Sequence, residues 1–145
     1  MPVEYAIPIV HNYLVGEGVR EEIVVMASGG IRTAFDVAKI IALGADGVVL
    51  GTSELVALGC TRCGNCERGR GCPLGIATTD PFLMKQVSPE WGALRVSNLY
   101  NSWKTQWNYI LTKLGLRSIR ELRPKTQVRF KDGKFDHLIH LDHVR

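Results

Sequence analysis

Apolar positions in the first fifty residues follow two different patterns. Between Glu4 and Val15 they recur every three or four residues, as on one face of a helix, and Gly16 and Gly18 mark its end. Two short continuous runs, Glu22–Ala27 and Gly47–Leu50, are rich in β-branched residues instead. Runs of this kind are typical of strands buried on both faces of a parallel sheet. We therefore expect a helix followed by two buried strands.

A second helical pattern lies between the two strand runs. Thr33 and Asp36 have the spacing of a capping box, and the apolar positions that follow end at Gly44. The order strand, glycine turn, helix, strand, glycine turn is a βα repeat, which makes parallel sheets with right-handed crossovers. Only two strands of such a sheet can be found in the sequence. The pattern predicts an α/β fold, of which this chain carries two strands.

The second half of the chain has mainly a helical pattern. Residues 88–90 have the composition of a helix start, and apolar residues continue at helical spacing to Gly115, which predicts one long helix of about seven turns. Ser118 begins a shorter pattern that stops before Pro124, and we expect a short helix there. Weak alternation around the Asp-Gly pair at 132–133 allows a small hairpin.

Composition and charge narrow the class of protein. The chain has 145 residues, of which 46% are hydrophobic and 22% charged, as in a soluble globular protein. No apolar run approaches the roughly 20 residues that cross a bilayer, and no secretory signal is visible, so we expect a cytoplasmic protein with no membrane partner. Ten of the eighteen Lys and Arg residues lie between Arg95 and Lys134. Acidic residues interrupt this stretch and no nucleic-acid motif is present, which favours a solvated helix or an acidic protein partner over nucleic acid.

Both strand runs end in a small-residue turn. Ser28-Gly29-Gly30 follows the first and Gly51-Thr52 follows the second. A phosphate group needs several backbone N–H groups pointing at it and no Cβ in the way, preferably near a helix N-terminus. One such turn alone is explained by the geometry of a βα connection. Two successive turns match the phosphate site after the seventh and eighth strands of many β/α barrels, so we expect a phosphate ligand here.

All four cysteines lie within thirteen residues, at Cys60, Cys63, Cys66 and Cys72, and Pro73 follows the last. So tight a group in a chain without a secretory signal favours metal ligation over disulfides. Zinc usually takes cysteine pairs separated by a longer loop, whereas three cysteines at intervals of three followed by Cys-Pro are typical of ferredoxin-like iron–sulfur sites. An iron–sulfur cluster is favoured; zinc and structural or redox thiols are the alternatives. Nearby arginines would offset the negative charge of a thiolate-bound cluster; they are Arg62, Arg68 and Arg70.

Several motifs in one order resemble the end of the flavin-binding synthase domain of the glutamate synthase family. They are Ala27-Ser-Gly-Gly-Ile-Arg-Thr33, Leu43-Gly-Ala-Asp-Gly-Val-Val-Leu-Gly-Thr52, Leu58-Gly-Cys60, Cys72-Pro-Leu-Gly-Ile-Ala-Thr78 and Leu114-Gly-Leu-Arg-Ser-Ile-Arg-Glu-Leu122. The resemblance implies a (β/α)8 TIM-type barrel that carries FMN beside an iron–sulfur cluster. In that family the flavin reduces 2-iminoglutarate, formed from 2-oxoglutarate and ammonia, to glutamate.

The same resemblance implies roles for named residues. The FMN phosphate would be held by Ser28, Gly29, Gly30, Gly51 and Thr52. The ligands of the family's three-iron cluster correspond to Cys60, Cys66 and Cys72. Bacterial members have one residue fewer between the second and third ligands, and Cys63 is an additional thiol; both features are similar to the archaeal-type branch. A 4Fe-4S cluster bound by all four thiols is therefore favoured over a 3Fe-4S cluster.

A complete barrel takes about 250 residues and eight strands, which this chain does not contain. We expect residues 1–59 to be the last βα units of the barrel, 60–78 the iron–sulfur loop, and 79–145 a helical extension with a tail. An N-terminal barrel portion or a separate subunit would supply the other strands and most residues for the flavin ring and 2-oxoglutarate. An electron-donor protein or subunit is expected as a further partner, and no catalytic acid or base can be named.

Other functions remain open at this point. They are a non-catalytic iron–sulfur electron-transfer module, an inactive gene fragment, and a barrel like that of inosine-monophosphate dehydrogenase. That last family lacks a four-cysteine loop after the final strand. Histidines recur every third residue near the C-terminus, where a polar tail is favoured over a metal site; they are His137, His140 and His143.

Overall fold

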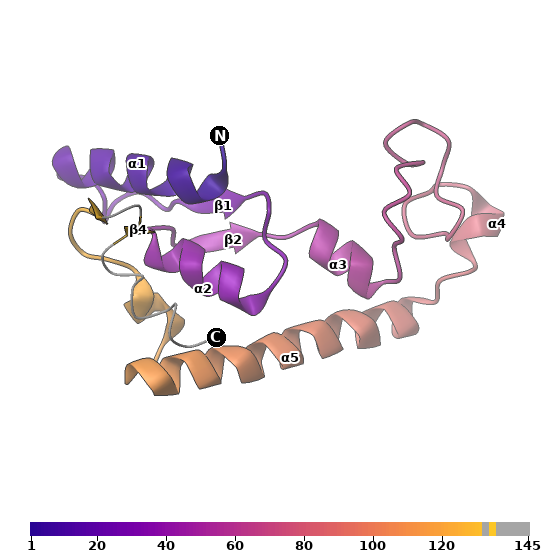
Figure 1. Cartoon of the computed structure of the whole chain (residues 1–145). Helices are drawn as coiled ribbons and strands as arrows, with labels where there is room; N and C mark the ends of the chain where they lie inside the picture. The colour runs from indigo at the N-terminus through magenta and orange to yellow at the C-terminus, as the bar shows by residue number, and fades with distance from the viewer. Residues whose placement is uncertain (132–133, 136–145) are drawn as a thin grey trace. The chain divides into compact units, whose positions relative to one another are not determined.

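The computed structural model describes residues 1–131 and 134–135 (Figure 1). It is a mixed helix and strand structure with a small parallel sheet, compatible with part of an α/β domain. Two compact units can be distinguished, one formed by Met1–Leu50 with Trp103–Arg145 and the other by Gly51–Ser102. The elements in chain order are α1 Val3–Gly16, β1 Met26–Ser28, α2 Ala34–Ala42, β2 Gly47–Val49, α3 Thr52–Ala57, α4 Pro81–Met84, α5 Pro89–Leu114, η1 Ile119–Leu122, β3 Phe130–Lys131 and β4 Lys134–Phe135.

The first two helices confirm the prediction from apolar spacing. Helix α1 buries the side chains that share one face, and helix α2 begins at the predicted capping box. The amide of Asp36 donates to the Thr33 hydroxyl at 3.2 Å, and the amide of Thr33 donates to the Asp36 carboxylate at 2.9 Å. Because both bonds are made, two of the otherwise unpaired N–H groups at the helix start are satisfied.

The two strands pair in parallel but are shorter than predicted. Met26, Ala27 and Ser28 lie opposite Gly47, Val48 and Val49. The predicted strand from Glu22 is wrong for its first four residues. The reason is local, because the chain before Gly47 connects to helix α2 and is not a strand. The N–H of Val25 donates to the carboxylate of Asp46 at 2.8 Å and not to a partner strand. Ladder pairing therefore cannot extend toward residue 22.

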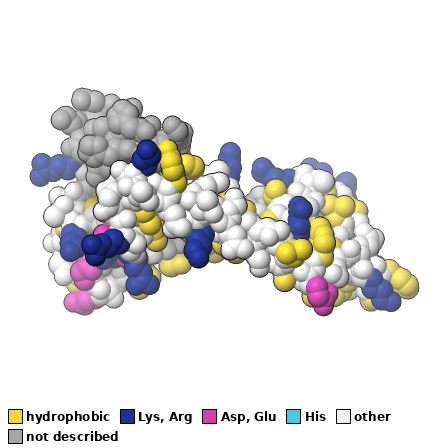
Figure 2. Space-filling view, turned by 90° about the horizontal axis from the view of Figure 1, so that it is seen from below, with side chains coloured by type: hydrophobic (Ala, Val, Ile, Leu, Met, Phe, Trp, Pro, Cys, Tyr) yellow, Lys and Arg dark blue, Asp and Glu magenta, His cyan; other side chains and the backbone are white. Residues whose placement is uncertain are grey.

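Burial on both faces of the sheet is not found either. Val24 is 72% exposed, and Met26 and Val49 are each 52% exposed. The inward side of the sheet packs on helices, with Ala27 buried against Ile40 and Leu43 of the same core cluster. The helices that contact the strands are α1, which lies beside β1, and α2, which lies beside β2 (Figure 1). Apolar side chains remain visible at the surface of the molecule in the space-filling view (Figure 2).

Helix α2 is the centre of the first unit. One side of it contributes Ile40 to the cluster formed with α1 and the sheet. The other side contributes Ala38, which packs with Ile110 of α5 and is flanked by Trp107 and Leu122. The indole N–H of Trp107 also donates to the carbonyl of Ala34 at 2.9 Å. Trp103 is buried and forms an edge contact with Trp107, so both tryptophans pack within this unit.

A buried polar network joins the ends of these elements. The Arg20 side chain is 5% exposed and forms an ion pair with Asp46 at 2.8 Å. It also donates to the Gly44 carbonyl at 2.7 Å and to His11 Nδ1 at 3.1 Å. His11 is fully buried, and its other nitrogen lies 3.0 Å from the Thr126 carbonyl. The network therefore ties α1, both strand starts and the chain after η1 together.

Acid should weaken this network through Asp46. Burial alone would raise the pKa of Asp46, but the bonds from Val25 and Arg20 and the charges of Arg20 and Arg123 outweigh it and hold the pKa below the ordinary value of 3.8. The ionised form is thus favoured by folding, so its contribution is present above the unfolded pKa and is lost as the pH falls through the lower folded pKa. We expect the urea concentration at the unfolding midpoint to decrease when the pH is lowered below about 4. The decrease should be smaller in Asp46→Asn, because the asparagine side chain does not titrate.

After β2 the chain forms one predicted helix and two that were not predicted. Helix α5 is a single helix of 26 residues, as predicted, and the Ser88 hydroxyl accepts the Trp91 N–H at 3.1 Å at its start. Helices α3 and α4 were not predicted, because six and four residues are too few to show an apolar period. Asp80 caps α4 by accepting the N–H of Phe82 at 2.8 Å.

The chain after α5 forms a short helical segment and an antiparallel strand pair, as predicted, with one difference. The segment from Ser118 forms the 3-10 helix η1 rather than an α-helix, since the backbone N–H of Glu121 donates to the carbonyl of Ser118, three residues earlier, at 3.0 Å. Strands β3 and β4 pair antiparallel, as expected for a hairpin. Its turn at 132–133 and the C-terminal histidines lie outside the described residues. No helix among the described residues has the length and apolar character needed to cross a membrane.

Candidate functional site

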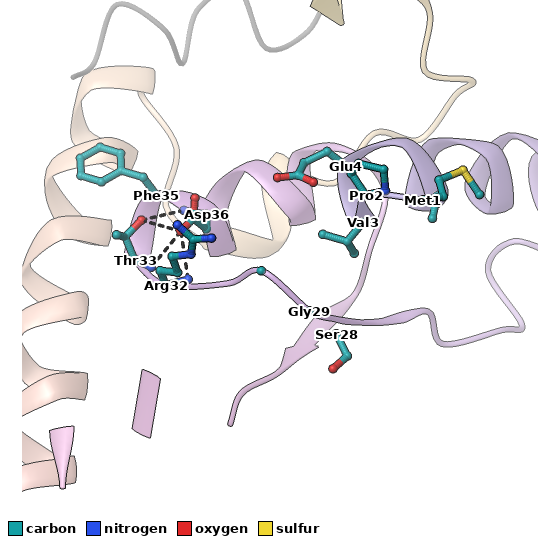
Figure 3. A pocket seen from close by; sticks show the side chains of 12 residues that line it. Met1, Pro2, Val3, Glu4, Ser28, Gly29, Arg32, Thr33, Phe35 and Asp36 are labelled. Carbon is teal, nitrogen blue, oxygen red and sulfur yellow. Dashed lines mark hydrogen bonds between the residues drawn. The ribbon is translucent and has the colours of Figure 1, made fainter. Parts of the chain in front are cut away.

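An open pocket of about 1110 Å³ lies at the carboxyl end of β1 (Figure 3). The start of α1, the turn after β1 and the start of α2 line it; the polar and charged lining residues are Glu4, Ser28, Arg32, Thr33 and Asp36. Its size is of the order of small-molecule sites, which are about 300–1,000 Å³. The first predicted phosphate turn is therefore the wall of a pocket.

The backbone of this turn requires glycine. Gly29 has φ of 103° and Gly30 has φ of 72°, in the left-handed region that other residues rarely adopt. A Cβ added at either glycine would meet nothing within 4 Å, so the space in front of the turn is open. A ligand can consequently approach the backbone closely at these two positions.

The start of α2 is less available to an anion than the sequence suggests. The Asp36 carboxylate accepts the N–H groups of Arg32 and Thr33 at 3.0 and 2.9 Å, and the Thr33 hydroxyl as well (Figure 3). Glu4 adds a second carboxylate to the pocket wall. A phosphate here would be held by the glycine turn and the Ser28 hydroxyl, with a cation needed to balance the acids.

Arg32 is a cation in the pocket wall, and it was not among the residues selected from the sequence. Its side chain is exposed and lines the pocket two residues after Gly30. A guanidinium group offers a fork of donors that matches a phosphate, so Arg32 adds the positive charge that the turn lacks. A basic residue two positions after a Gly-Gly turn was the available signal.

Gly51 and Thr52 belong to the second unit, where α3 begins. Gly51 is the N-cap residue, with φ of −154° and ψ of −75°, and Thr52 is the first helical residue. Both residues are exposed. Leu50 separates them from Val49, the strand partner of Ser28, so along the chain they follow the carboxyl end of β2 as the first turn follows that of β1.

The four thiols differ in exposure and are not gathered. Cys63 and Cys66 are exposed, Cys60 is half-buried, and Cys72 is 7% exposed. Within residues 1–131 and 134–135, no three Cys, His or acidic side chains converge at a distance suited to a metal ion. The predicted ligand set thus stays a prediction.

Cys72 has an environment suited to a thiolate. The backbone N–H of Ala77 donates to its sulfur, and although burial opposes this, further N–H bonds from Leu74, Ile76 and Gly75 keep the pKa of Cys72 below the ordinary value of 9.0. Amide N–H bonds to sulfur are also what stabilises iron–sulfur clusters in proteins. The donor set, four thiols with one sulfur already surrounded by amides, fits an iron–sulfur cluster.

Comparison with known proteins decides the family. A family model described as a conserved region in glutamate synthase matches residues 1–117, a range that contains both glycine turns and all four cysteines. The chain belongs to the glutamate synthase family.

Relatives within the glutamate synthase family include archaeal-type enzymes. An archaeal glutamate synthase (NADPH) of Methanocaldococcus jannaschii is 50% identical over 123 residues, which are 85% of this chain and 24% of the relative. An archaeal-type glutamate synthase (NADPH) of Thermotoga maritima is 43% identical over 128 residues, 88% of this chain and 25% of the relative. The glutamate synthase (NADH) of Saccharomyces cerevisiae is 35% identical over 124 residues, 84% of this chain and 6% of the relative.

The chain therefore spans about a quarter of the length of the archaeal-type glutamate synthases that it matches. The resemblance drawn from the glycine and cysteine motifs is confirmed at the level of the family. The roles of individual residues rest on the chemistry described above.

Proposed function

We propose that this chain supplies the FMN phosphate site and the cluster ligands of a glutamate-synthase-type oxidoreductase. The reaction would reduce 2-iminoglutarate, formed from 2-oxoglutarate and ammonia, to glutamate with two electrons and two protons. The observation that carries the proposal is the family match over residues 1–117, in which a glycine turn beside a pocket and four thiols occur together.

The proposed role of the first turn is to hold the phosphate of FMN. Ser28, Gly29 and Gly30 would donate from the hydroxyl and the backbone, and Arg32 would supply a positive charge. Gly51 and Thr52 are assigned to the same phosphate from their place after β2. These residues bind and orient, and none of them exchanges a proton with the substrate.

The proposed role of the cysteine loop is to hold the cluster through Cys60, Cys63, Cys66 and Cys72. Four thiolates favour 4Fe-4S, and ligation by three of them would give 3Fe-4S. The cluster held by these thiols would supply one-electron transfer, and FMN held at the glycine turns would supply the two-electron reduction of the C=N bond of the imine. Amide bonds to the Cys72 sulfur and the exposed Arg62, Arg68 and Arg70 would balance the added negative charge.

The exposed sheet supports the proposal that other strands complete a barrel. Strands β1 and β2 each have one unpaired edge among the described residues, and apolar side chains such as Val24 and Met26 face outward. Such edges are prone to pair with further strands. We propose that an N-terminal barrel portion or a separate subunit provides them, together with the sites for the flavin ring and 2-oxoglutarate, and that an electron-donor protein or subunit feeds the cluster.

The test is anaerobic purification of the chain with and without the portion that completes the barrel; the combination is called the assembled protein below. We expect iron, inorganic sulfide and FMN in the assembled protein, and glutamate formation from 2-oxoglutarate and ammonia with a reductant. A cluster without FMN would instead indicate an electron-transfer module. Zinc, or neither sulfide nor FMN, would contradict the proposal, and the last result is what an inactive fragment predicts.

Arg32→Ala should weaken FMN binding in the assembled protein. Loss of a charge-assisted bond costs about 1.5–3 kcal/mol, so the FMN dissociation constant should rise about 10- to 150-fold. Flavin fluorescence during titration of the FMN-free protein would measure it. Lys39→Ala is the matched control, since Lys39 lies in the last turn of α2 and does not line the pocket. An equal effect of both substitutions would remove Arg32 from the phosphate site.

A further inference from the structure

Helix α3 lies against the first half of α5 within the second unit (Figure 1). Two hydrogen bonds join the helices, and they run in opposite directions along them: the Tyr100 hydroxyl donates to the Glu54 carboxylate, and Arg95 Nε donates to the Ala57 carbonyl at 2.7 Å. Beyond them, a Cβ built on Gly92 or on Gly59 would stand within 4 Å of the side chain of Leu58 or of Trp91, respectively. Helix α5 thus holds α3 from its first turn to its last.

The end of α3 fixes the backbone of the first cysteine. Gly59 has φ of 90°, and its N–H donates to the Val56 carbonyl at 2.9 Å. The N–H of Cys60 donates to the Leu55 carbonyl, also at 2.9 Å. This pair of bonds is a Schellman motif, in which the residue after the left-handed glycine is still bonded to the helix. Cys60 is therefore placed by the helix end and not by the loop that follows.

Arg95 completes this helix end. The Ala57 carbonyl is among the last carbonyls of α3, which have no partner within the helix. Arg95 Nε donates to it, and the guanidinium lies 5.4 Å from the centre of the Trp91 ring, where a cation–π contact stabilises it. Its positive charge is favourable at the negative end of a helix dipole. One side chain thus satisfies the carbonyl and brings a cation to the segment from which Cys60 follows.

We propose that Arg95 is a positioning residue for the iron–sulfur cluster and that its charge makes the cluster easier to reduce. The inference rests on the proposed function, because it assumes Cys60 as a ligand. Reduction adds negative charge to a thiolate-bound cluster, so a nearby cation stabilises the reduced form and raises the reduction potential. Binding of the cluster by Cys60 also depends on the end of α3, which the hydrogen bond from Arg95 to the Ala57 carbonyl holds in place.

Three substitutions at Arg95 separate the effect of its charge on the reduction potential from the effect of its hydrogen bond on the position of Cys60. Arg95→Lys keeps the charge, Arg95→Gln keeps a donor without charge, and Arg95→Met removes both. In the assembled protein we expect a more negative midpoint potential in Arg95→Gln and Arg95→Met, and the wild-type potential in Arg95→Lys. Iron loss to a chelator should be fastest in Arg95→Met. Lys104→Gln, which removes an exposed cation from the same helix, should leave both quantities unchanged.

A third measurement does not need the cluster. Hydrogen exchange of the Cys60 amide should be faster in cluster-free Arg95→Met than in cluster-free wild type. The inference is overturned if exchange, potential and iron loss in Arg95→Met all equal those of the wild type. A wild-type protein that binds no iron or sulfide overturns the proposed function instead, and Arg95 then has no cluster to position.

Discussion

Replacing Cys72 by serine is expected to abolish cluster binding in the assembled protein. Cys72 is 7% exposed, and its sulfur accepts backbone N–H bonds that favour the ionised form, so it is the thiol best prepared to bind iron. A serine hydroxyl ionises far less readily than a thiol and is a poor ligand for iron. Iron and inorganic sulfide should fall to background, and the visible absorbance of the cluster should be lost.

The same substitution at Cys63 distinguishes the two cluster types. Cys63 is exposed and is the thiol in addition to the three that the family resemblance assigns. For a four-iron cluster, Cys63→Ser should cause loss of one iron and give the electron paramagnetic resonance signal of an oxidised three-iron cluster. For a three-iron cluster, Cys63→Ser should change nothing. Full cluster content in Cys72→Ser would contradict the ligand assignment altogether.

Replacing Arg20 by methionine is expected to destabilise the first unit by about 3–5 kcal/mol, because removal of one partner from a buried ion pair leaves the other uncompensated. Arg20 donates to Asp46, to the carbonyls of Ile23 and Gly44, and to the ring of His11. Methionine fills similar space but replaces none of these bonds. Urea denaturation of the assembled protein, with hydrogen exchange to locate the change, would measure the loss.

Arg120→Met is the matched control for Arg20→Met. Arg120 is an exposed arginine of η1 in the same unit, and a substitution at such a surface position usually changes stability by less than about 0.5 kcal/mol. The charge change is identical in the two variants. Equal urea midpoints for the two variants would show that the hydrogen bonds of Arg20 contribute nothing to stability beyond the effect of net charge.

Local rules account for the elements that sequence reasoning found. The Thr33 and Asp36 pair satisfies backbone groups within four residues of each other, so the start of α2 can be read without any tertiary contact. Helix α5 was found because its 26 residues repeat the apolar period many times. Helices α3 and α4 were not found, because they depend on caps and neighbours and not on a repeated pattern.

Some residues of the candidate site are also marked by a local sequence pattern, and others are not. Glycine turns and closely spaced thiols are visible in one sequence, since both chemistries need particular residue types at short separations. Arg32 and Arg95 were not selected, because an arginine on an exposed segment has no pattern that marks its partner. Their roles came from the pocket at the end of β1 and from the carbonyl at the end of α3.

The sequence by itself determined the class of fold, the two turns, the cysteine loop and the family motifs, because these depend on neighbours along the chain. Only the tertiary structure decided that Arg20 joins His11 to Asp46, that amides surround the Cys72 sulfur, and that the strands stop after three residues. Those features depend on groups far apart in the chain or on the exact path of the backbone, and no local period specifies them.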